Sequence, residues 1–127
     1  MNEGLDKPNK TAEQEPMRGK ILLVDDDVVM TELTAKSLQL ENFAVETAGV
    51  PQDAFQLLAK NQYDGLIVDG LNGGWVGLAK MALNLGLKVI LHTTDPDRYK
   101  NDPLITSGQV RLLAKPALAE DFIINLQ

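Results

Sequence analysis

Residues 20–27, KILLVDDD, determine the fold class of this chain, because a short aliphatic run ends there in three consecutive carboxylates. The run 21–24 is apolar at every position, whereas a strand with one face in water alternates apolar and polar residues. Four aliphatic residues also fall far short of the roughly 20 that a membrane-spanning helix needs. The stretch therefore predicts a strand of a parallel sheet that helices cover on both faces.

Similar aliphatic runs recur along the chain and alternate with longer amphipathic stretches, a pattern typical of βα units. Asp27 and Asp95 stand where helix N-caps are expected, and Pro103 is expected to kink or end the fourth helix because proline lacks a backbone N–H. The sequence thus predicts an α/β fold, a doubly wound (βα)5 three-layer sandwich around a parallel five-stranded sheet. The expected strands are 20–24, 43–48, 64–68, 88–93 and 110–114, and the expected helices are 28–41, 51–60, 75–85, 96–107 and 117–126.

The composition of the 127-residue chain excludes several classes of site. It contains no cysteine and a single histidine, His92, so disulfides, thiolate zinc sites, iron–sulfur clusters and sites with two imidazoles are ruled out. The net charge of -6 repels phosphate backbones and anionic membranes on average. We therefore expect no direct contact with nucleic acid or membrane.

The first 19 residues differ in composition from the rest of the chain. They hold four apolar side chains, two prolines and mixed charges, too little apolar surface to offset the entropy of ordering. We expect residues 1–19 to form a flexible tail and residues 20–127 to form one domain. The N-terminus carries no apolar signal-peptide core, which favours a cytoplasmic protein.

The carboxyl ends of the expected strands carry the residues suited to chemistry, and ligands of doubly wound sheets bind at this edge. Crowded carboxylates repel one another unless a cation lies among them, and oxygen ligands without His or Cys indicate a hard cation such as Mg²⁺. Asp69, alone at the end of its strand, is the best candidate to accept a phosphoryl group beside that cation. The residues expected at this edge are Asp25, Asp26, Asp27, Asp69, Thr93, Thr94 and Lys115.

Four segments in register resemble the marker segments of the receiver domain of two-component response regulators: ILLVDDD (21–27), YDGLIVD (63–69), VILHTT (89–94) and LLAKP (112–116). The resemblance covers residues 20–126 and implies a flavodoxin-like strand order, 2-1-3-4-5. It implies a signalling phosphoprotein rather than an enzyme, one that at most catalyses its own phosphorylation and dephosphorylation. Its implied partners are a sensor histidine kinase or phosphotransfer protein and an unknown downstream protein effector.

The resemblance also implies roles for single residues. Asp69 would accept the phosphoryl group and, with Asp26, would ligate Mg²⁺, while Asp25 would act through water. The third metal ligand would be the backbone carbonyl of Leu71.

Thr93 and Lys115 would contact the phosphoryl oxygens, and a cis peptide before Pro116 would aim the lysine. In the family, phosphorylation pulls the threonine inward and reshapes the face made by the fourth helix, the fifth strand and the fifth helix.

Several positions depart from the family pattern. The interval of 24 residues from Asp69 to Thr93 is shorter than usual, and the loop after the acceptor is the glycine-rich stretch 70–75, GLNGGW. Leu112 replaces the usual aromatic residue three positions before the lysine, and Thr94 replaces a small residue. The glycines loosen the loop that should supply the Leu71 carbonyl, so this departure bears most directly on metal binding.

Ordinary structural roles compete with these interpretations. The run 25–27 could be an ordinary strand-to-helix turn with a capping aspartate, Asp69 or Thr93 could simply end a strand, and Lys115 could be a solvated surface lysine. His92 should point away from the face that Thr93 occupies, as a half-buried strand-end residue. Trp75 is expected to pack against the short loop, and the glycines at 73–74 fit no nucleotide-binding motif.

Two other functions remain open at this point. A degenerate receiver would bind a protein partner regardless of phosphorylation, as the short loop, Leu112 and Pro103 suggest. A phosphatase of the haloacid dehalogenase type would use 25–27, Thr93 and Lys115, but it needs a further acidic pair, for which the chain offers Glu120 and Asp121.

Overall fold

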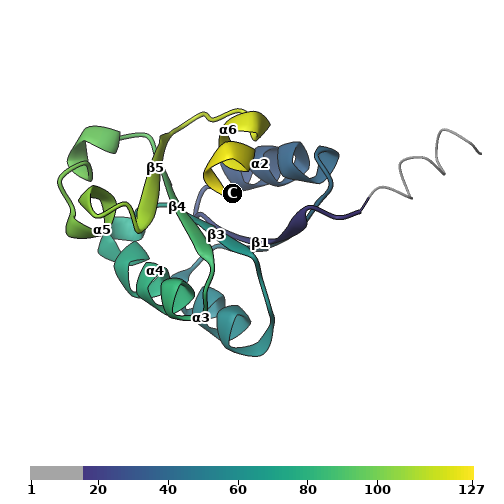
Figure 1. The fold of residues 1–127 in the computed structure, drawn as a ribbon, viewed down its shortest axis with the longest axis horizontal. Coiled ribbons are helices and arrows are strands. Elements are labelled where there is room, and N and C mark those ends of the chain that lie inside the picture. The colour runs from purple at the N-terminus through teal and green to yellow at the C-terminus, as the bar shows by residue number, and fades with distance from the viewer. Residues whose placement is uncertain (1–15) are drawn as a thin grey trace, which may run out of the picture.

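The computed structural model describes residues 16–127, so residues 1–15 of the predicted tail lie outside the described part of the chain. Five strands form one parallel sheet in the order β2-β1-β3-β4-β5, which confirms the predicted fold class and strand order (Figure 1). The strands are β1 (Gly19–Val24), β2 (Phe43–Ala48), β3 (Gly65–Val68), β4 (Lys88–Thr93) and β5 (Val110–Ala114).

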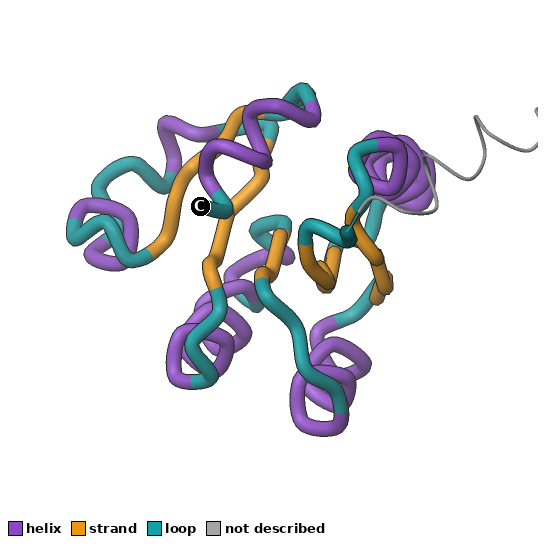
Figure 2. The backbone as a smooth tube through the Cα atoms, turned by 45° about the vertical axis from the view of Figure 1, so that its right-hand side comes forward, coloured by secondary structure: helices purple, strands orange, loops and turns teal. Residues whose placement is uncertain are grey.

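Helices cover both faces of the sheet and complete the three layers (Figures 1 and 2). On one face lie α2 (Val28–Leu40) and α6 (Ala119–Asn125), and on the other lie α3 (Pro51–Lys60), α4 (Trp75–Asn84) and the short α5 (Pro103–Thr106). Two short 3₁₀ turns, η2 (Leu71–Gly73) and η3 (Pro96–Arg98), precede α4 and α5.

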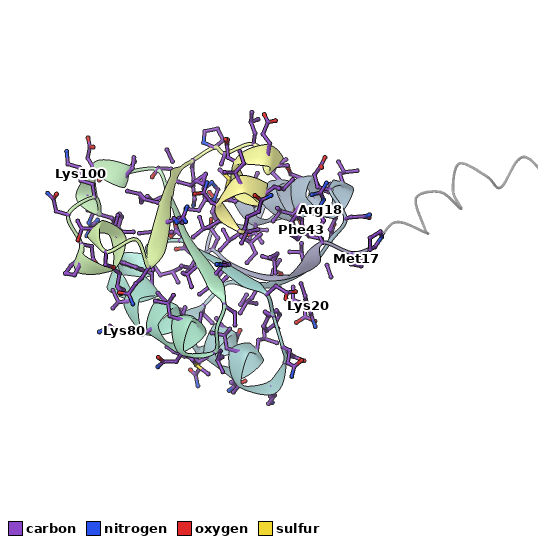
Figure 3. All side chains as sticks on the ribbon, viewed as in Figure 1. Met17, Arg18, Lys20, Phe43, Lys80 and Lys100 are labelled. Atoms are coloured by element: carbon purple, nitrogen blue, oxygen red, sulfur yellow. The ribbon has the colours of Figure 1, made fainter. Side chains whose placement is uncertain are left out.

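Alternation along the central strands divides the core in two. In β1, Ile21 and Leu23 pack with α2 and α6, whereas Leu22 and Val24 face α3 and α4. All four are at most 2% exposed, as the uninterrupted aliphatic run predicted. By contrast, the labelled side chains of Lys80 and Lys100 lie at the periphery of the molecule (Figure 3).

The ends of the helices show one correct and one wrong cap prediction. The Asp27 carboxylate accepts the Met30 N–H at 3.0 Å and caps α2, as predicted. Asp95 precedes η3 but caps nothing with its side chain; Asp102 instead accepts the Leu104 N–H at the start of α5. The reason is Pro103, which starts a new helix and so moves the capped end seven residues along the chain.

The predicted helix 96–107 is therefore two short pieces rather than one, as its internal proline suggested. The other boundaries agree with the prediction or differ from it by at most two residues. Among the described residues no helix is long and apolar enough to span a membrane.

Candidate functional site

Three carboxylates meet at the carboxyl edge of the sheet. Because Val24 of β1 is paired with Val68 of β3, the residues that come after them, Asp25 and Asp69, lie side by side. The Asp69 N–H donates to the Val24 carbonyl at 2.9 Å and continues this pairing past the end of the strands. Each of Asp25, Asp26 and Asp69 offers one oxygen such that these atoms all lie within 4.8 Å of one another.

Lys115 joins two of these carboxylates. Its Nζ lies 2.6 Å from Asp25 Oδ2 and 2.9 Å from Asp69 Oδ1, and its side chain is 6% exposed. The peptide bond to Pro116 is cis, as the resemblance implied, and the Lys115 N–H donates to the Thr93 carbonyl at 2.8 Å. The ammonium group thus supplies the positive charge that two adjacent carboxylates require.

The environment of Lys115 favours its protonated form. Burial by itself lowers the pKa of this amine, but hydrogen bonds and charge attraction from Asp25 and Asp69 outweigh burial and raise it above 10.5. The lysine is therefore a permanent cation at the site at physiological pH.

The three aspartates have different surroundings. Asp25 is buried, with Oδ2 on Lys115 and Oδ1 accepting the Asp27 N–H at 2.9 Å. Asp26 is exposed, and the Asp69 side chain is 20% exposed. Asp26 and Asp69 are therefore the carboxylates that an incoming ion or phosphoryl group can reach, while Asp25 is held by the protein.

The loop after β3 has an unusual backbone. Leu71 and Asn72 both have positive φ, at 53° and 54°, which is uncommon for residues other than glycine. The Leu71 N–H donates to Asp69 Oδ2 at 3.2 Å, and the Leu71 carbonyl accepts the Gly74 N–H at 3.0 Å. The carbonyl expected to ligate a metal thus already has a hydrogen-bond donor, and a second lone pair remains for another contact.

Thr93 lies at the end of β4, where it is 5% exposed. Its Oγ1 accepts the Asp95 N–H at 3.0 Å and so holds the start of the following segment. Thr94, next to it, is exposed. Leu112 is half-buried against the α3 and α4 side of the core.

His92 is buried more deeply than the half-buried position that the sequence predicted. It is 2% exposed, its ring meets Phe122 of α6 edge to face at 4.9 Å, and its Nε2 has no hydrogen-bond partner among the described residues. Burial, then the positive charge of Lys115, lower its pKa to about 4, against a weaker opposing effect of Asp69. The prediction was wrong because it had no means of placing Phe122 over the end of β4.

Tyr99 is a residue that the sequence analysis missed. Its hydroxyl lies directly against Gly70, the residue after Asp69, and its ring meets Trp75 edge to face at 5.9 Å. Trp75 is 2% exposed, which confirms its predicted packing role. The signal available in the sequence was the glycine at position 70, next to the candidate acceptor.

The donor set fits a hard divalent cation. The cluster contains oxygen ligands alone, and two of its carboxylates, those of Asp26 and Asp69, are open to solvent. The same edge presents an ammonium group at 2.9 Å from the Asp69 carboxylate. The arrangement is therefore chemically suited to binding a cation and a phosphoryl group side by side.

Known proteins resemble the chain in sequence and structure, although no protein-family model matches it. The signal receiver domain of an HD domain-containing protein from Pseudomonas fluorescens Pf-5 is 26% identical, with a TM-score of 0.70 over 86% of this chain and 91% of that one. The response regulator TrrA from Thermotoga maritima, solved in complex with Mg²⁺ and BeF, shares the fold at 24% identity and a TM-score of 0.69, over 85% of this chain and 98% of that one.

A curated relative, the transcriptional regulatory protein CpxR homolog of Haemophilus influenzae, is 54% identical over 39 residues, which are 31% of this chain. The match spans 17% of that relative's length. Together with the marker segments and the observed strand order, these similarities show that the chain resembles response regulator receiver domains in sequence and shares their fold.

Proposed function

We propose that Asp69 accepts a phosphoryl group from a sensor histidine kinase or phosphotransfer protein, and that the phosphorylated domain acts on a downstream protein effector. The observation that carries the proposal is the position of Lys115 Nζ, 2.9 Å from Asp69 Oδ1 and 2.6 Å from Asp25 Oδ2. An acceptor carboxylate needs a fixed positive charge beside it, because phosphoryl oxygens bring further negative charge.

The transfer forms a bond between an Asp69 carboxylate oxygen and phosphorus and breaks the bond from phosphorus to the donor's histidine nitrogen, which takes up a proton. Asp26 and Asp69 would hold Mg²⁺, with Asp25 acting through water, and the bound ion supplies charge neutralisation to the phosphoryl oxygens. Lys115 is already in place to move from the carboxylate to those oxygens. Thr93 would contribute its hydroxyl once it releases the Asp95 N–H. We place this signalling role in the cytoplasm.

The test is the intact mass of the protein after incubation with acetyl phosphate and Mg²⁺. The wild type should gain one phosphoryl group, and Asp69→Ala should gain none. Asp95→Ala is the matched control, because Asp95 is exposed and lies outside the carboxylate cluster; it should react like the wild type. An unreacted wild type, or an adduct that persists in Asp69→Ala, would contradict the proposal.

A degenerate receiver is the second candidate, and one observation favours it: the Leu71 carbonyl already accepts a hydrogen bond from Gly74. A domain of this kind would bind its partner with no phosphoryl group and no metal. Titration with millimolar Mg²⁺, followed by Trp75 fluorescence, separates the two, because a working receiver should respond and a degenerate one should not.

The phosphatase alternative loses support from the surroundings of its required acidic pair. The Asp121 carboxylate accepts the Leu118 N–H at 3.1 Å at the start of α6, and Glu120 is exposed on the same helix. Asp121 is therefore used to cap a helix, and the carboxylate cluster consists of Asp25, Asp26 and Asp69.

A further inference from the structure

Position 70 requires a glycine because of a neighbouring side chain and not because of its backbone conformation. Its φ of -61° and ψ of -32° lie in the right-handed helical region, which any residue adopts without strain. A Cβ at this position would instead collide with the hydroxyl oxygen and Cζ of Tyr99. The absence of a side chain at position 70 thus permits one specific contact, between the residue after Asp69 and the end of the Tyr99 ring.

Tyr99 is held in this position from a second side. Its ring meets that of Trp75 at an interplanar angle of 86°, and Trp75 is the buried first residue of α4. The Arg98 guanidinium lies 5.7 Å from the centre of the Tyr99 ring. Tyr99 therefore lies between the loop after the acceptor and the start of α4, and its hydroxyl is directed at Gly70.

The segment that carries Tyr99, residues 94–107, is attached to the core by few groups. Neither η3 nor α5 has a fully buried residue, and the partly buried apolar side chains that pack on the core are Tyr99, Leu104 and Ile105. The segment begins at the hydrogen bond from the Asp95 N–H to Thr93 Oγ1. One of its attachments, Tyr99, thus lies against Gly70, the residue that follows the acceptor.

We propose that Tyr99 is a positioning residue that couples the state of Asp69, through Gly70, to the conformation of segment 94–107. Asp69 Oδ2 accepts the Leu71 N–H at 3.2 Å, so a phosphoryl group on this carboxylate changes the hydrogen bonding of the backbone directly after Gly70. Gly70 has no free space toward Tyr99, so a shift of the loop displaces the ring and the segment with it. Leu112 offers no aromatic ring for such coupling from β5.

The proposal rests on the proposed function, and its test compares hydrogen exchange of segment 94–107 before and after loading with acetyl phosphate and Mg²⁺. In the wild type, phosphorylation should change exchange in this segment several-fold. Tyr99→Ala should still gain the phosphoryl group but lose that change, and Tyr99→Phe, which keeps the ring, should retain part of it. Leu104→Ala is the matched control: it loosens the same segment without touching Gly70, and should keep the response.

A second pair of variants tests the contact itself. Gly70→Ala should slow adduct formation several-fold, because the new Cβ meets Tyr99, and Gly70→Ala combined with Tyr99→Ala should recover the rate of Tyr99→Ala alone. An equal slowing in both backgrounds, or an exchange response in Tyr99→Ala as large as in the wild type, would overturn the coupling while leaving the acceptor role intact. A wild type that gains no phosphoryl group would overturn both.

Discussion

The Asp69 carboxylate lies between two sides of the site that are built in different ways. On the charged side, the turn 25–27 and Lys115 are joined by short polar contacts, among them those of 2.6 Å and 2.9 Å to Asp25. On the packed side, the loop 70–74 has an irregular backbone and is held by the rings of Tyr99 and Trp75. Ion pairs dominate the first side, whereas ring packing and backbone hydrogen bonds hold the second.

This difference separates the two tasks that the proposed function requires. The charged side contains groups that would handle a phosphoryl group and a cation, and its geometry is already fixed by ion pairs. The packed side leads away from the acceptor into a segment with no fully buried residue in η3 or α5, which is suited to changing shape. The stability of variants on the two sides should therefore depend differently on cations and on pH.

The largest loss of stability is expected from Trp75→Ala on the packed side. Removing a fully buried indole should lower the free energy of unfolding by about 3–5 kcal/mol, because a cavity opens between α4, the loop and Tyr99. Urea unfolding followed by circular dichroism measures this, and added Mg²⁺ should recover none of the difference. Recovery by Mg²⁺ would show that the packed side depends on charge after all.

Lys115→Met on the charged side should cost roughly 3 kcal/mol, because Asp25 would remain buried beside Asp69 with no counter-ion. Millimolar Mg²⁺ should restore part of this loss by replacing the missing positive charge. The same unfolding experiment with EDTA and with Mg²⁺ measures both effects. A loss that is identical in the two conditions would contradict a cation site at these carboxylates.

The pH dependence of stability should carry a contribution from His92. Its pKa is about 4 in the folded protein against an ordinary 6.5, so the unfolded chain binds more protons between these values. The contribution is fully favourable above pH 6.5 and is lost as the pH falls toward 4, by on the order of 2–3 kcal/mol. His92→Leu should flatten the curve over this interval, and the difference between the two unfolding curves isolates the histidine; parallel curves would refute its burial in the neutral form.

The smallest effects distinguish the two aspartates that the sequence proposed as helix caps. Asp27→Ala should lower the free energy of unfolding by about 1 kcal/mol, because it removes the hydrogen bond to the Met30 N–H at the start of α2. Asp95→Ala should stay within roughly 0.5 kcal/mol of the wild type, because its side chain caps nothing. Equal losses would mean that the two turns are held in the same way.

Much of the charged side could be predicted from the sequence because its residues come directly after strands. An aliphatic run identifies a buried strand, and its end identifies the edge at which Asp25, Asp69 and Lys115 must meet. This meeting point can be predicted without the folded structure, because parallel strands bring their carboxyl ends to one edge of the sheet. Residue-by-residue burial could not be predicted in the same way, as the deeper burial of His92 shows.

The parallel sheet, the positions of its strands, and the carboxylates and lysine at one edge can be read from the sequence, since they depend on periodicity and on the residues that end each strand. Three contacts emerge from the folded structure alone: Asp25 is the buried aspartate bonded to Lys115, Phe122 covers His92, and Tyr99 lies on Gly70. These contacts join residues 29 to 90 positions apart in the chain. They depend on how the layers and loops pack together, which a local pattern does not encode.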